Sequence, residues 1–144
     1  MSAESNVEAI TGFHDAMEVG DRDALGELFD VTAHAECEWV PLVVEVEGQS
    51  YRGREGVRAF FDDFLDSFEV RYENRELRAV GEGAVLILCQ AALRGRESGA
   101  ELVQEMGVLY EFEDGLLRRG RAYPSHAAAI SAAAALARGE EVST

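Results

Sequence analysis

The sequence predicts an α+β fold in which a strongly bent antiparallel sheet wraps around N-terminal helices. Up to residue 69, apolar residues recur mainly at the three- and four-residue spacing of amphipathic helices. From residue 70 to 124, four alternating or apolar segments are joined by glycine-containing turns. Helices that are segregated in this way from an antiparallel meander are typical of the α+β class.

A single domain of residues 1–139, followed by a short frayed tail at 140–144, is expected from the length of the chain. With 144 residues, of which 47% are hydrophobic, the chain is large enough to bury a core without disulfides or metals. No apolar run approaches the ~20 residues that cross a bilayer. The N-terminus lacks the basic and apolar regions of a signal peptide, so we expect a cytoplasmic protein.

The formal charge of −15 argues against nucleic acid and anionic membranes as partners, because both would require a basic surface. The absence of lysine excludes Schiff-base chemistry. Cys37 and Cys89 lie in apolar or alternating segments without CxxC spacing, which favours small buried hydrophobes over redox groups. No cofactor is expected.

Two helices are expected at the start of the chain. The first, residues 4–19, ends at Gly20, and Asp21 can cap the second. Residues at helical spacing form their buried stripes: Val7, Ile10, Phe13, His14 and Met17, then Ala24, Leu25, Leu28 and Phe29.

A strand and a third helix follow. Residues 35–48 alternate apolar residues with acids, as a half-exposed strand does, and Pro41 is expected to break it. After Gly53, a helical face is formed by Val57, Phe60, Phe61, Phe64, Leu65 and Phe68, with acids on its reverse. This face is interpreted first as core, whose inner edge at Phe60 and Phe64 lines a cavity. Truncating any one of its four phenylalanines is expected to destabilise the protein severely.

Four strands, residues 70–81, 84–95, 101–112 and 116–124, should form the meander, with the doubly apolar second strand at its centre. Ser125 is expected to cap a final alanine-rich helix that ends at Gly139. A bent sheet around helices leaves a conical space, and pockets commonly form in such places.

Three segments, "HDAMEVGDRDALGELF" (14–29), "YRGREGVRAFF" (51–61) and "GRESGAELVQEMGVLYEFEDGLLRRGRAY" (95–123), carry a resemblance. In this order and spacing they resemble the SnoaL-like branch of the nuclear transport factor 2-like superfamily, over about residues 6–137. The resemblance implies a cone-shaped α+β barrel that is often a homodimer. The superfamily includes polyketide cyclases, ketosteroid isomerases, epoxide hydrolases, dehydratases and catalytically silent binders, so no single activity is implied.

The ketosteroid isomerase pattern is not preserved in this sequence. Where the resemblance would place a general-base Asp before proline, Val40 precedes Pro41. Phe13 stands at the position of the family's tyrosine, and Val108 near that of its neutral carboxylic acid. The last strand closes on "YPS" without the acid of the Tyr-x-Asp pattern. That chemistry is therefore not expected.

His14, Gln104 and Tyr110 are the candidate catalytic residues. A histidine on the buried stripe of the first helix, with a pKa near neutrality, could act as general base. Strand parity places Gln104 and Tyr110 on the inner face, where they could stabilise an oxyanion. The alternative, structural core residues, stays open for His14 and Gln104. The expected pocket wall consists of Phe13, Met17, Trp39, Phe60, Phe64, Met106 and Val108.

Two further groups are interpreted structurally. His34, Glu36 and Glu38 alternate on one strand face, but without a second cluster they indicate a solvated edge, and no metal site is expected. Tyr123 and His126 are expected near the pocket mouth, with a capping or packing role.

Two hypotheses for function follow. The first is a cyclase-like or isomerase-like enzyme that moves a proton next to a carbonyl. The second is a non-catalytic, dimeric protein that binds a hydrophobic small molecule.

Overall fold

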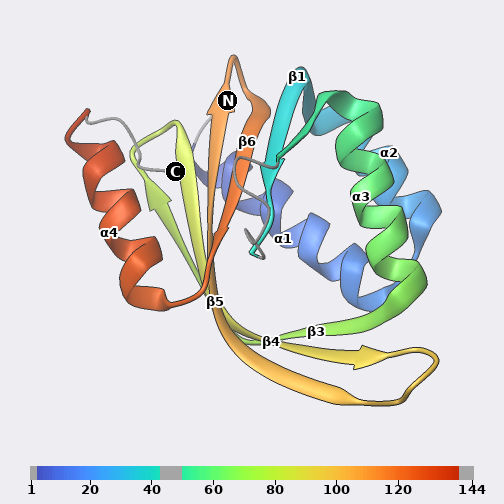
Figure 1. The fold of residues 1–144 in the computed structure, drawn as a ribbon. Helices are drawn as coiled ribbons and strands as arrows, with labels where there is room; N and C mark the ends of the chain where they lie inside the picture. Colours follow the sequence, from blue (N-terminus) through green and yellow to red (C-terminus); the bar gives the residue numbers. More distant parts are fainter. Residues whose placement is uncertain (1–2, 43–49, 140–144) are drawn as a thin grey trace.

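A computed structural model of the chain describes residues 3–42 and 50–139. Its elements are α1 (Ala3–Val19), α2 (Arg22–Thr32), β1 (Ala33–Val40), β2 (Tyr51–Arg52), α3 (Gly53–Ser67), β3 (Phe68–Val80), β4 (Ala84–Gly95), β5 (Glu101–Glu113), β6 (Leu116–Tyr123) and α4 (His126–Ala137). Helices α1, α2 and α3 lie on the concave side of a bent sheet, and α4 covers part of the opposite face (Figure 1). None of the described helices combines the length and apolarity that a bilayer span requires.

The sheet has the strand order β2-β1-β6-β5-β4-β3, and the predicted meander from β3 to β6 is antiparallel throughout. The α+β fold class is confirmed, but β1 pairs with β6 in parallel, which makes the sheet mixed. The parallel pair arises because α3 carries the chain to the far edge at β3, and the meander then returns to β1. The short strand β2, antiparallel to β1, was not predicted.

The helix boundaries follow the expected local signals. Gly20 ends α1 with a φ of 75°, a conformation that glycine adopts without steric cost. The side chain of Asp21 accepts a hydrogen bond from the backbone N–H of Ala24 at 3.0 Å, which caps α2. Ser125 caps α4 in the same way, through the N–H of Ala128 at 3.1 Å.

Strand β1 ends at Val40, directly before Pro41. Within β1, Cys37 and Trp39 are buried, as the alternation predicted. Of the rest of the predicted segment, residues 43–48 lie outside the described residues.

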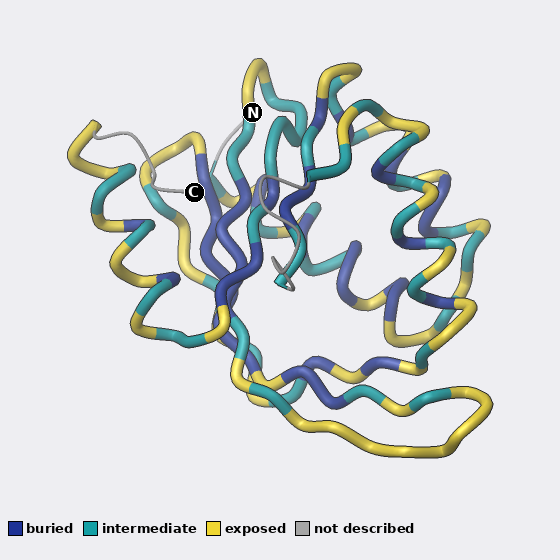
Figure 2. Tube along the Cα trace, viewed as in Figure 1, coloured by how far each residue is buried: buried dark blue, intermediate teal, exposed yellow. Residues whose placement is uncertain are grey.

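The bent sheet separates two apolar clusters. The inner cluster lies between the sheet and helices α1, α2 and α3, and the outer one lies under α4. Strand β4 serves both clusters, and its residues 84–89 are all buried, as expected for a central strand (Figure 2). The outer cluster is formed by Ala84, Leu86, Leu88, Leu109, Tyr123, Ala129 and Ala133.

The phenylalanine-rich face of α3 divides into two parts. Val57, Phe61 and Leu65 are fully buried in the inner cluster. Phe60 and Phe64 are only partly buried and pack against it. The face is therefore core along its centre, and its edge stays open toward a cavity.

Candidate functional site

A cavity of about 730 Å³ lies between the concave face of the sheet and helices α1 and α3. Most of its wall is apolar, and much of it is aromatic. All ten residues that the sequence suggested for catalysis or for the pocket wall line it: His14, Gln104, Tyr110, Phe13, Met17, Trp39, Phe60, Phe64, Met106 and Val108. The structure brings these residues together, and their roles stay predictions.

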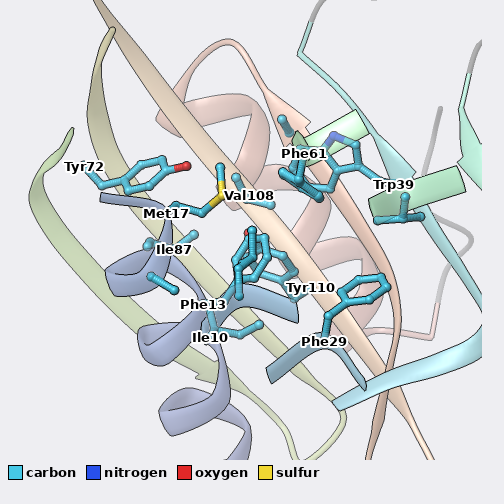
Figure 3. Packing of buried hydrophobic residues seen from close by; sticks show 14 of the residues in the cluster. Ile10, Phe13, Met17, Phe29, Trp39, Phe61, Tyr72, Ile87, Val108 and Tyr110 are labelled. Carbon is cyan, nitrogen blue, oxygen red and sulfur yellow. The ribbon is translucent and has the colours of Figure 1, made fainter. Parts of the chain in front are cut away.

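The aromatic wall is built from rings of several elements, among them Phe13, Trp39, Phe61 and Tyr110 (Figure 3). Trp39 of β1 lies 5.2 Å from the ring of Phe61 and is stacked at 6.4 Å on Tyr110, measured between ring centroids. Phe13 of α1 meets Phe61 edge to face at 5.1 Å. Such offset and edge contacts are favourable aromatic geometries, so the wall is held by packing among its own members.

Sequence reasoning missed some of the wall. Tyr51 of the short strand β2 contacts Phe60 at 4.8 Å between ring centroids, but two residues of strand give no periodic signal. Tyr72 and Val70 lie on the inner face of β3, and their alternation in the sequence was a signal that could have identified them.

The polar centre of the cavity is a hydrogen bond between His14 and Tyr110. The Nε2 of His14 lies 2.8 Å from the Tyr110 hydroxyl, and both residues are 2% exposed. The ring of Tyr72 meets the imidazole edge to face, with centroids 4.3 Å apart. The described residues offer no hydrogen-bond partner to the Nδ1 of His14. This pair joins the first helix to the centre of the sheet.

Burial sets the protonation of this centre. Burial, and to a smaller extent the nearby Arg75 cation, together lower the pKa of His14 from 6.5 to about 3. The sequence-based expectation of a pKa near neutrality is therefore wrong, because no carboxylate partner offsets the loss of water. Burial raises the pKa of Tyr110 well above its usual value, and that of Tyr72 in the same direction. All three side chains are uncharged at neutral pH.

Arg75 of β3 forms ion pairs with two acidic residues of α1 beside the His14–Tyr110 hydrogen bond. Its guanidinium binds Asp15 at 2.7 Å and Glu18 at 2.9 Å. Glu18 also accepts a hydrogen bond from the backbone N–H of Tyr72 at 2.7 Å. The strand is irregular here, between Glu73 and Glu76. These contacts of Arg75 and Glu18 hold Tyr72, which packs on His14, in position.

Other polar groups on the wall are few. Gln104 is half-buried and lines the cavity. The indole Nε1 of Trp39 is buried and has no partner in the described part of the chain. Among the described lining residues, the exposed Glu101 is the one Asp, Glu or Arg.

Tyr123 and His126 do not lie at the pocket mouth, which corrects the sequence-based expectation. The Nε2 of His126 bonds the carbonyl oxygen of Cys89 at 2.8 Å, and its backbone N–H donates to Glu105. Tyr123 belongs to the outer cluster under α4. The expectation failed because the sheet places the start of α4 on the face opposite the cavity.

The residues of the proposed solvated edge have polar partners, and the cysteines are buried. His34 accepts a hydrogen bond from the N–H of Glu36 at 2.9 Å, and Glu38 pairs with Arg119 at 3.4 Å. Both cysteines are free and buried. Burial raises the pKa of the Cys89 thiol to about 11, which leaves it protonated at neutral pH.

Comparisons with known proteins agree with this architecture. The chain resembles an NTF2-like protein from Burkholderia xenovorans LB400, with 22% identity, a TM-score of 0.68, and coverage of 85% of this chain and 91% of that one. It also resembles a candidate polyketide cyclase from Xanthomonas campestris pv. campestris, with 17% identity and a TM-score of 0.70. That match covers 85% of this chain and 92% of the other. A third similar structure is a Catenulispora acidiphila protein with a ketosteroid isomerase-like fold, with 15% identity and a TM-score of 0.65. That match covers 94% of this chain and 95% of the other. At these identities the likeness shows the fold alone.

A comparison with curated proteins finds no match. The model of the SnoaL-like domain family, in contrast, matches residues 10–120, which is most of the chain. The chain therefore belongs to the SnoaL-like domain family.

Proposed function

We propose that this protein binds a hydrophobic small molecule in the cavity between the sheet and helices α1 and α3. The observation that carries the proposal is the cavity itself, about 730 Å³ in volume and walled mainly by apolar and aromatic side chains. Sites for small organic ligands commonly measure ~300–1,000 Å³ and combine an apolar wall with few polar groups. The Catenulispora acidiphila protein was solved in complex with trimethylamine, which supports the use of this fold for holding an organic molecule.

1-Ethylpyrene, an uncharged aromatic hydrocarbon, is a suitable probe. We expect it to raise the melting temperature of the protein, because a ligand that binds only the folded state stabilises that state. At a free concentration of 100 times the Kd, the gain is ~2.7 kcal/mol. Differential scanning fluorimetry or calorimetry over a ligand series measures the shift.

Two matched substitutions show where the ligand binds. Met106→Trp adds bulk to the cavity wall and should reduce the shift, whereas Ile130→Trp, on the exposed side of α4, should leave it unchanged. Each shift is taken relative to the same variant without ligand. A shift that is absent in the native protein, or equal in both variants, would contradict the proposal.

A homodimer and a single domain over residues 1–139 are further parts of the proposal. The homodimer is implied by the family resemblance, and the single domain by a size that is typical of one domain. Sedimentation velocity tests the dimer through the mass of the particle.

Proton transfer next to a carbonyl is the second candidate function. The hydrogen bond between His14 and Tyr110 favours it, because an imidazole and a phenol meet in the wall of the cavity. The likeness to the candidate polyketide cyclase adds support. However, a pKa of about 3 makes His14 a weak base at neutral pH, so the geometry supports binding better.

Hydrogen–deuterium exchange separates the two candidate functions. The methyl group of 1-acetylpyrene lies next to its carbonyl and exchanges with D2O only through an enol or enolate. We expect the native protein to bind this ketone without accelerating the exchange beyond the rate in buffer, measured by mass spectrometry. Accelerated exchange that His14→Gln abolishes, with the fold intact by circular dichroism, would establish the enzyme instead.

A further inference from the structure

We propose that His14 is a positioning residue that donates its Nε2 proton to Tyr110 and thereby directs the Tyr110 hydroxyl proton into the cavity. The cavity would then select uncharged lipophilic molecules that carry an oxygen acceptor, such as a ketone or quinone carbonyl. This inference rests on the proposed binding function and adds to it the chemical class of the ligand.

The first step concerns which ring nitrogen carries the proton. An uncharged imidazole has one N–H donor and one nitrogen acceptor. Nε2 of His14 faces the Tyr110 hydroxyl at 2.8 Å, while Nδ1 is buried without a partner among the described residues. Buried N–H groups without an acceptor are rarer in proteins than acceptors without a donor. Nδ1 is therefore the unprotonated nitrogen, whose lone pair has no donor, and Nε2 carries the proton.

The packing holds the imidazole in this orientation. The rings of Phe13, Tyr72 and Tyr110 surround it at centroid distances of 5.6, 4.3 and 5.8 Å, all close to edge-to-face geometry. A ring that is enclosed on three sides and 2% exposed cannot exchange its two nitrogens by a free flip. The N–H of Nε2 therefore stays directed at the Tyr110 oxygen, which accepts the hydrogen bond.

The Tyr110 hydroxyl then has one hydrogen left to donate. Its oxygen already accepts from His14, and the structure gives it no other partner among the described residues. A hydroxyl that accepts a hydrogen bond becomes a stronger donor, because the two bonds polarise each other. Tyr110 lines the cavity, so a bound molecule can supply the missing acceptor.

The charges around the cavity decide what kind of acceptor fits. Among the described lining residues there is no arginine, and Glu101 at the exposed end of β5 is negative. The whole chain carries a formal charge of −15 and has no lysine. A carboxylate would lose its hydration without gaining a counter-ion, whereas a neutral carbonyl needs only the phenolic donor.

Nuclear magnetic resonance tests the proton position without any ligand. Long-range ¹H–¹⁵N correlations of the imidazole rings distinguish a protonated from an unprotonated ring nitrogen. The chain has three histidines, and the signals that disappear in His14→Gln belong to His14. We expect Nε2 to be protonated and Nδ1 unprotonated at pH 7. A protonated Nδ1 would overturn the inference.

A matched ligand series tests the selectivity. 1-Ethylpyrene, 1-acetylpyrene and pyrene-1-carboxylate share one ring system and differ in the acceptor and the charge. We expect the ketone to bind most tightly and the carboxylate most weakly. Tyr110→Phe should weaken ketone binding about fivefold and change hydrocarbon binding little. Tyr123→Phe, which alters the outer face of the sheet, is the control and should change neither.

The outcomes separate this inference from the proposed function. If 1-ethylpyrene binds but the ketone has no advantage that depends on Tyr110, the inference fails and the binding function stands. If none of the three compounds binds, the binding function fails and the claim of ligand selection falls with it. The resonance measurement still decides the proton position in that case.

Discussion

Phe61→Ala is expected to lower the free energy of unfolding by about 3–5 kcal/mol, the usual cost of truncating a buried phenylalanine. Phe61 is 6% exposed and lies at the centre of the inner cluster. Its ring contacts Phe13, Trp39 and Phe60 at centroid distances of 5.1, 5.2 and 5.1 Å. Equilibrium unfolding in urea, with the slope compared between variants, measures the loss.

Phe64→Ala is the matched control on the same helix. Both phenylalanines line the cavity, but Phe64 is only partly buried, whereas Phe61 is buried in the inner cluster, so the removal of Phe64 loses less buried apolar surface. We expect a loss below about 2 kcal/mol. This revises the sequence-based expectation that truncating any one of the four phenylalanines would destabilise the protein severely. Equal losses for both variants would mean that Phe64 is part of a filled core.

The protein should lose stability on acidification because of His14. Its pKa is about 3 in the folded state, against an ordinary value of 6.5 for histidine. The unfolded chain therefore binds a proton as the pH falls below about 6.5, while the folded protein does not until the pH approaches 3. The stability of the folded state is unaffected by His14 protonation well above pH 6.5, and it falls as the pH drops below that value. Between pH 7.5 and 5 it should lower the free energy of unfolding by about 2 kcal/mol.

His14→Gln isolates this effect from other groups. Glutamine does not titrate, so the variant should lose about 2 kcal/mol less than the native protein over the same pH interval. Carboxylates that titrate near pH 5 contribute to both proteins and cancel in the comparison. The comparison uses only the change in the free energy of unfolding between the two pH values, so a difference in stability at pH 7.5 does not affect it. Parallel pH profiles would show that His14 is not held neutral in the folded state.

Periodicity in the sequence was sufficient for most of the fold. Helical spacing gave α1, α2 and α3 because each helix has one buried face. Alternation along β5 placed Gln104, Met106, Val108 and Tyr110 on one face, and all four line the cavity. These patterns are local, so the residue order alone carries them.

The remaining features depend on contacts between distant segments. The parallel pairing of β1 with β6 follows from the path of the whole chain and has no signal in either strand. The low pKa of His14 results from enclosure by the sheet and from Arg75, which lies on β3, sixty-one positions later in the chain. Asn74, beside Arg75, has a φ of 55° at the irregular part of β3, and strand alternation does not predict it.

The fluorescence of Trp39 tests most directly whether the cavity holds a hydrophobic molecule. Trp39 is the single tryptophan of the chain and lines the cavity, and pyrene absorbs where tryptophan emits. We expect 1-ethylpyrene to quench the Trp39 emission by energy transfer, with the quenching saturating at one molecule per chain. Quenching that stays linear without saturation, or that is absent, would contradict a cavity that binds such molecules.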